Sequence, residues 1–154
     1  MAGRDPGRSA AGAGRDPQER LIMTATFAAT RENEVVEHSE RWVTAVHEAG
    51  HAITAEYLGY QVDDCRVRTD TTGNTRHNAE GTAHAVVAVA GERAARIITG
   101  SGGGCTEDYC QAEDALSGSG RDIAWAEHQA DDAIWSCRRE ITNLARRLYY
   151  RGRR

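Results

Sequence analysis

Apolar residues recur at the three- and four-residue spacing of an α-helix through most of the chain after Ser39. Ser39 is a favourable N-cap residue, and Gly59 and Gly100 are natural residues to follow a helix end. The spacing predicts four helices, at about 40–58, 82–100, 107–116 and 121–150. Gly91 falls inside the second of them, which is tolerable if another backbone packs closely against it.

The segment between the first two predicted helices has a different pattern. Val62, Cys65 and Val67 suggest a short strand, and Thr72-Gly73-Asn74 marks a turn, so this segment is either a small hairpin or one strand with a loop. The expected fold class is therefore mainly α, or α+β with a minor β element, in one compact helical domain.

The composition divides the chain into a tail and a domain. Residues 1–22 contain the tetrapeptide GRDP twice and are rich in Gly, Ala, Arg and Pro, so we expect 1–38 to form a disordered tail. Met23 is an alternative biological start. Residues 39–150 are expected to form a single domain, as the length of 154 residues suggests, followed by a basic end at 151–154.

Charge and residue usage exclude several functions. All 19 basic residues are Arg, so the chain has no lysine for a P-loop or a Schiff base. The net charge of −4 makes nucleic acid an unlikely partner. The longest apolar run, Ala85 to Ala90, is too short for a membrane span. The four cysteines lack CxxC spacing, and nothing signals export, so we expect a cytoplasmic protein with reduced thiols.

The segment His47-Glu48-Ala49-Gly50-His51 carries the chemistry. Residues four apart lie on one face of a helix, so His47 and His51 can supply two of three protein ligands to Zn²⁺. Glu48 then lies beside a metal-bound water, where it can act as general base and afterwards as general acid. Two surface histidines on an ordinary helix are the alternative interpretation.

A third ligand must come from a distant segment, because no histidine follows His51 at the distance of the extended signature. Carboxylates and the remaining histidines are candidates. Those histidines are His38, His77, His84 and His128.

The succession of HEAGHA, a short strand, a helix with AGERAARI, a Gly-rich loop and Asp-x-x-x-Ala resembles a known domain. It is similar to the peptidase domain of the FtsH-type ATP-dependent zinc metalloproteases, and most similar to small stand-alone relatives without the AAA ATPase. The resemblance covers about 40–150. Ala95 and Arg96 depart from it, because the family usually carries Glu in that stretch.

The resemblance implies that the third zinc ligand is an Asp at a helix start, four residues before Ala. Asp108, in SGGGCTED and followed by Ala112, matches this position, and Asp122 in SGSGRD is a second fit. The distance from Gly100 favours Asp108. Cys105 and Cys110 flank this loop and are further possible metal donors.

The sequence therefore predicts a zinc metallopeptidase that acts on peptides or unfolded protein segments without its own ATPase. A separate ATPase or one dedicated protein is the expected partner. The alternative is a catalytically weak regulatory or binding module that keeps the metal site. Such a module would act through the C-terminal helix, where Arg138–Arg154 contains seven Arg and one acidic residue. A third possibility is a helical interaction protein without metal.

Overall fold

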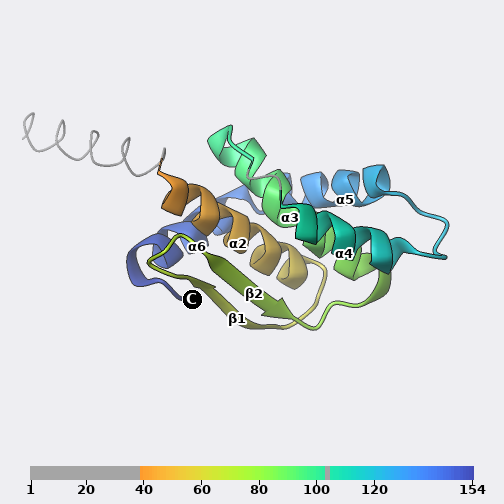
Figure 1. Ribbon diagram of the computed structural model, residues 1–154, viewed down its shortest axis with the longest axis horizontal. Coiled ribbons are helices and arrows are strands. Elements are labelled where there is room, and N and C mark those ends of the chain that lie inside the picture. Colours follow the sequence, from red (N-terminus) through yellow and green to blue (C-terminus); the bar gives the residue numbers. More distant parts are fainter. Residues whose placement is uncertain (1–38, 103–104) are drawn as a thin grey trace, which may run out of the picture. The chain divides into compact units, whose positions relative to one another are not determined.

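The computed structural model describes residues 39–102 and 105–154, and the tail predicted at 1–38 lies outside them. The described residues form five helices and one β-hairpin (Figure 1), which confirms the mainly α fold class with a minor β element. The elements are α2 (Glu40–Tyr57), β1 (Val62–Val67), β2 (Gly73–His77), α3 (Gly81–Thr99), α4 (Thr106–Leu116), α5 (Ile123–Ser136) and α6 (Arg138–Arg151).

Helix α2 is the central element. Its N-cap is Ser39, whose hydroxyl oxygen accepts a hydrogen bond from the backbone N–H of Trp42 at 3.2 Å. Trp42 itself is 3% exposed, so the helix starts inside the core. Helix α2 contacts α3, α6 and both strands of the hairpin, and Figure 1 shows it between the hairpin and α3. Helix α2 is thus held from more than one side.

The contact between α2 and α3 is very close because both helices carry a glycine there. A Cβ atom on Gly50 would lie 2.6 Å from the Ala94 Cβ and 2.8 Å from the Ala90 carbonyl oxygen. The same Cβ position is 3.3 Å from the Cα of Gly91. The close approach of α2 therefore explains the glycine at position 91, as the sequence suggested. The tight packing offsets the cost of about 1 kcal/mol that a glycine carries inside a helix.

Strands β1 and β2 pair antiparallel, with Cys65 opposite Thr75 and Val67 opposite Gly73. The turn expected at 72–74 was misplaced. Gly73 already belongs to β2, and the turn is centred on Asp70, whose carboxylate accepts hydrogen bonds from the backbone N–H and hydroxyl of Thr72. This Asx-type turn therefore lies a few residues earlier in the sequence than Gly73 suggested.

The other edge of β1 is covered by the C-terminal residues. The backbone N–H of Val67 donates to the Gly152 carbonyl at 2.8 Å, and the N–H of Arg154 donates to the Cys65 carbonyl at 3.0 Å. Residues 152–154 thus extend the sheet on the side away from β2.

The single helix predicted at 121–150 was wrong, because the structure has two helices separated at Cys137. The backbone of Cys137 has φ −114° and ψ 21°, outside the helical range. Its N–H still closes α5, and its carbonyl already accepts from Ile141 in α6. This one-residue break lets α5 pack on α3 while α6 packs on α2 and β1.

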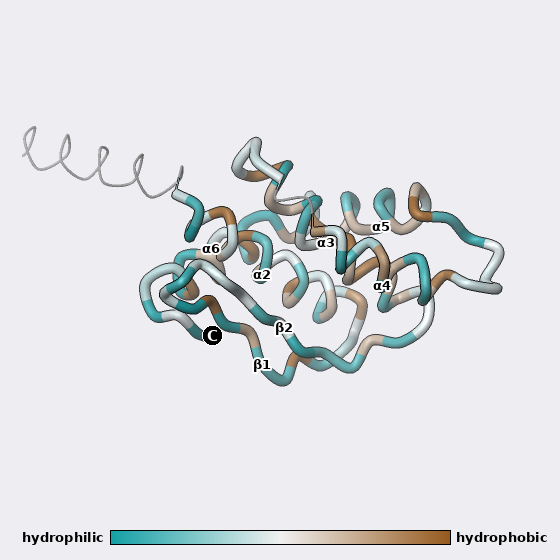
Figure 2. Tube along the Cα trace, viewed as in Figure 1, coloured by the Kyte–Doolittle hydropathy of each residue, from teal (hydrophilic) through white to brown (hydrophobic). Residues whose placement is uncertain are grey.

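The core lies where α2 and α3 meet α5 and α6. Its largest fully buried apolar side chains include Val46, Val89, Ile134, Ile141, Leu144 and Leu148. Figure 2 shows hydrophobic residues along α3 and mostly hydrophilic residues along the hairpin. None of the helices in the described part of the chain has the length and apolar character needed to cross a membrane.

Candidate metal centre

His47 and His51 face each other on α2, as their spacing predicted. Their Nε2 atoms are 2.9 Å apart. The Nδ1 of His51 lies 2.7 Å from the Val87 carbonyl oxygen. A carbonyl can only accept, so Nδ1 carries the proton and donates, and the Nε2 of neutral His51 presents a lone pair to His47. A fixed tautomer of this kind is usual for a histidine that binds a metal.

Asp108, on the first turn of α4, completes this group. Its Oδ2 lies 3.1 Å from the His47 Nε2 and 3.4 Å from the His51 Nε2, yet this buried oxygen has no well-formed hydrogen bond within the described residues. Three ligands of a tetrahedral metal at about 2.0–2.1 Å are separated from one another by about 3.3 Å. The observed separations match that spacing, so the three donor atoms fit one metal ion.

The charges of the group also suit a cation. Burial tends to raise the pKa of the Asp108 carboxyl, but contact with His47 and His51 outweighs burial and holds that pKa well below its usual range. Burial tends to lower the pKa of His51, and the negative charges of Asp108 and Glu48 outweigh it, so the net shift is upward. The site therefore holds a carboxylate and attracts positive charge.

The floor of the site is the backbone of α3. A Cβ atom on Gly91 would overlap the His51 Nε2 and would lie 2.8 Å from the His47 Nε2. Only glycine leaves room for both imidazoles at this point. The close crossing of α2 and α3 and the histidine pair therefore depend on the same residue.

Glu48 is 6% exposed and its carboxylate lies against β2. The Thr75 hydroxyl donates to the Glu48 Oε2 at 2.6 Å. A Cβ atom on Gly73 would overlap the same carboxylate. Sequence reasoning missed both residues, and the only signal that could have found them is the register of the hairpin, which sets Thr75 opposite Cys65.

These side chains line a pocket of about 220 Å³. Besides the residues already described, its wall includes Asn74, His77, His84, Cys105 and Gln111. The rings of His77 and His84 lie 5.3 Å apart between centroids. Burial, together with the positive charges of His84 and His51, lowers the pKa of His77 to about 4, so His77 is neutral near pH 7.

Two other candidate ligands from the sequence, Asp122 and His128, do not line this pocket. Asp122 is the N-cap of α5, where its Oδ1 accepts from the backbone N–H of Trp125 at 2.9 Å, and it lines a separate surface hollow. His128 is exposed on α5 beside Asp132. His38 lies outside the described residues. Of the two acidic alternatives, the structure thus brings Asp108 to the histidines and assigns Asp122 to a helix cap.

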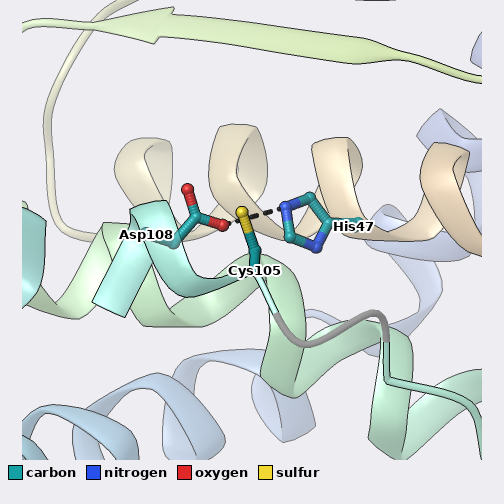
Figure 3. Close-up of side chains that lie close together, drawn as sticks. All are labelled: His47, Cys105 and Asp108. Atoms are coloured by element: carbon teal, nitrogen blue, oxygen red, sulfur yellow. Dashed lines mark ion pairs between the residues drawn. The ribbon is translucent and has the colours of Figure 1, made fainter. Parts of the chain in front are cut away.

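Cys105 lies next to the site as well. One ligand atom each from His47, Cys105 and Asp108 fall within 4.8 Å of one another (Figure 3). Cys110, the other cysteine named from the sequence, is exposed on α4 and absent from this group. All four cysteines are free thiols.

Polar side chains on α3, α4 and α5 make contacts beside the site. The Tyr109 hydroxyl donates to Glu127 of α5 at 2.7 Å, and Arg93 of α3 forms a bidentate pair with Asp131 of α5. Glu92 is 1% exposed, pairs with Arg96 and packs so closely on Gly102 that a Cβ there would overlap it. Sequence reasoning did not identify Glu92, because it looked for an acid at positions 95 and 96.

Comparison with known proteins gives one family match. No curated protein and no solved structure matches the chain. The family model described as Peptidase M50B-like matches residues 21–107, which is more than half of the chain. The match includes His47, Glu48 and His51 and ends one residue before Asp108. The chain therefore belongs to the Peptidase M50B-like family and contains a metallopeptidase-family domain.

Proposed function

We propose that the protein is a zinc-dependent metallopeptidase with an FtsH-like active site that hydrolyses bonds in peptides or unfolded protein segments. The observation that carries this proposal is the convergence of His47, His51 and Asp108 on one point, with Glu48 beside it. Family membership supports peptide hydrolysis independently.

The donor set favours zinc. Two imidazoles and one carboxylate, with room for a fourth ligand, are typical of catalytic zinc sites. His47, His51 and Asp108 would hold the ion, and the His51 ring is oriented by the Val87 carbonyl. When bound, zinc supplies a Lewis acid that activates water and polarises the scissile carbonyl.

Glu48 moves the proton in this proposal. Its carboxylate takes a proton from the attacking water and passes it to the leaving amine. The Thr75 hydroxyl donates a hydrogen bond to Oε2 of Glu48. Oε1 is then the carboxylate oxygen that accepts the proton from water. The low exposure of Glu48 keeps bulk water from competing for this carboxylate.

The hairpin favours an extended peptide as substrate. One edge of β1 is covered by residues 152–154 and the other by β2, while Gly73, Asn74, Thr75 and His77 of β2 line the pocket. An extended chain can add to a free strand edge through backbone hydrogen bonds. Because the chain lacks a P-loop lysine, we propose that its substrates arrive unfolded or are unfolded by a separate partner.

The direct test is Glu48→Gln in the purified, zinc-loaded protein. We expect zinc content to stay near one ion per chain while cleavage of a quenched-fluorescence peptide falls about 10²–10⁴-fold, because the general base is lost. Glu40→Gln, at an exposed position in the first turn of the same helix, is the matched control and should keep full activity.

Wild-type rates in a zinc-loaded Glu48→Gln protein would sink the proposal. A folded wild type that binds zinc but cleaves no peptide would favour the regulatory or binding module instead. Zinc is measured by elemental analysis of untagged protein, with His47→Ala as the variant expected to lose the ion.

A further inference from the structure

The metal centre contains a fourth donor that the peptidase mechanism does not use. His47 and Asp108 belong to two overlapping groups of donors. One group includes His51, and the other includes Cys105. Figure 3 shows the Cys105 sulfur beside the line that joins His47 and Asp108. The sulfur is therefore next to the position where these two residues would share an ion.

We propose that Cys105 Sγ is the fourth protein ligand of the resting metal centre, where it occupies the position that water needs for hydrolysis. This inference rests on the proposed zinc site. Thiolate is a preferred zinc ligand, and a sulfur at about 2.3 Å from a tetrahedral ion lies about 3.6 Å from nitrogen and oxygen ligands. The donor atoms of Cys105, His47 and Asp108 already lie within 4.8 Å of each other.

The local structure leaves the Cys105 thiol available for this role. Cys105 is the N-cap residue of α4, but its side chain makes no capping hydrogen bond. By contrast, the Cys65 thiol is buried and donates to the Glu48 carbonyl. Burial and the negative charge of Asp108 raise the pKa of the Cys105 thiol in the metal-free protein, although the backbone N–H groups of Glu107 and Asp108 at the start of α4 act in the opposite direction.

The ligand exchange is balanced without any oxidant. The S–H bond of Cys105 is replaced by a sulfur–metal bond, its proton leaves to solvent, and one water leaves the ion. A site closed by four protein ligands is typical of structural zinc, whereas a catalytic site keeps one open position. Hydrolysis therefore requires Cys105 to leave, which makes this residue a regulator of the site.

Cobalt substitution tests the ligand directly. We expect the full chain loaded with Co²⁺ to show the visible bands of a tetrahedral ion and a near-ultraviolet thiolate-to-cobalt charge-transfer band. Cys105→Ser should lose the charge-transfer band and still bind cobalt through the other three ligands. Cys110→Ser, in the same helix but exposed, is the matched control and should keep both signals.

The outcomes separate this inference from the proposed function. Cobalt binding without a charge-transfer band, or with a band that survives in Cys105→Ser, overturns the role of Cys105 and leaves the zinc site standing. Absence of cobalt binding in folded wild type overturns both.

Activity gives a second readout. Zinc-loaded Cys105→Ala should cleave the quenched peptide several-fold faster than wild type, because its fourth position stays open. A rate equal to or below that of wild type overturns the inhibitory role, even if the spectra show sulfur ligation. Cleavage that disappears in Glu48→Gln shows that the measured activity belongs to this site.

Discussion

Thr75 orients the carboxylate of Glu48 from a strand and not from the motif helix. The hydroxyl donates to the Glu48 Oε2 at 2.6 Å and stands 3.2 Å from the Glu48 carbonyl oxygen. A carboxylate fixed in this way keeps its free oxygen in one direction. Loss of a supporting contact of this kind typically costs about 10–100-fold in metal affinity or activity.

Replacing Thr75 by Val should lower kcat for peptide cleavage about 10-fold, because Glu48 loses the hydroxyl donor that holds its Oε2 and can rotate. Zinc content should not change, since Thr75 does not contact the histidines. Thr75→Ser keeps the hydroxyl and should retain most of the activity. Equal loss in the Ser and Val variants would mean that the methyl group, and not the hydrogen bond, is what matters.

His77 makes stability depend on pH. Its folded-state pKa is about 4, against about 6.5 in an unfolded chain, so between these values the unfolded chain binds a proton that the folded chain does not. The free energy of unfolding therefore falls as pH drops through 6.5 and levels off below about 4. Metal-free His77→Gln should lose less stability than wild type between pH 7 and pH 5.

Urea unfolding with chelator present measures this difference at the two pH values. His128→Gln removes an exposed histidine and should follow wild type. The interpretation fails if wild type and His77→Gln lose the same free energy of unfolding over this range.

At the scale of helices, the crossing of α2 and α3 serves both the core and the metal site. Gly50 faces Ala90 and Ala94 of α3, and Gly91 faces the two imidazoles of α2. The two glycines are therefore separable by mutation. A methyl group on Gly50 would press on α3 itself, whereas a methyl group on Gly91 would enter the space of the imidazoles.

Gly91→Ala should abolish stoichiometric zinc binding, because the new methyl group takes the space of the His51 Nε2. Gly50→Ala should instead destabilise the fold by about 1–3 kcal/mol through overpacking, while the protein that remains folded keeps its zinc. Elemental analysis and urea unfolding of the two variants test this contrast. Full zinc content in Gly91→Ala would show that the rings can move away without loss of the site.

Most helix ends were predictable from the sequence, but the break between α5 and α6 was not. The predicted ends of the first three helices agree with the structure within one or two residues, because Ser39 and Gly100 are strong local signals. The break at Cys137 has no such signal, since no Gly or Pro stands there and the apolar spacing continues across it. It follows from packing of α5 and α6 on different neighbours, which is not encoded locally.

At the scale of the whole molecule, the C-terminal residues belong structurally with the site. Residues 152–154 pair with β1, β1 pairs with β2, and β2 carries Thr75 against Glu48. Arg154 also forms an ion pair with Glu56 at the end of α2. Removal of the last three residues thus uncovers an edge of the sheet whose other strand holds Glu48.

Deletion of residues 152–154 should lower the free energy of unfolding by about 1–3 kcal/mol, since two backbone hydrogen bonds to β1 and the cap bond from Gly152 to Leu148 are lost. Arg154→Ala removes only the exposed ion pair and should cost less than about 1 kcal/mol. Thermal unfolding compares the two. A deletion no more harmful than Arg154→Ala would show that the pairing with β1 adds nothing to stability.

The site was predictable only where it is local. The pair His47 and His51 and the adjacent Glu48 can be found from sequence, because helical geometry alone puts them together. Asp108 and Asp122 both fit the spacing of a third ligand, and their different surroundings depend on how α4 and α5 pack. Thr75 and Glu92 carry no motif, so their contacts could come only from the fold.

The order in which the ligands appear has a consequence for how the protein is made. His47 and His51 are one helical turn apart, while Asp108 follows His51 by 57 residues. During synthesis at about 5–20 residues per second, both imidazoles are available several seconds before the carboxylate exists. An ion captured at that time would hold one turn of α2 in helical form and offset the cost of helix nucleation. A metal bound at this stage would take part in chain folding before the third ligand is made.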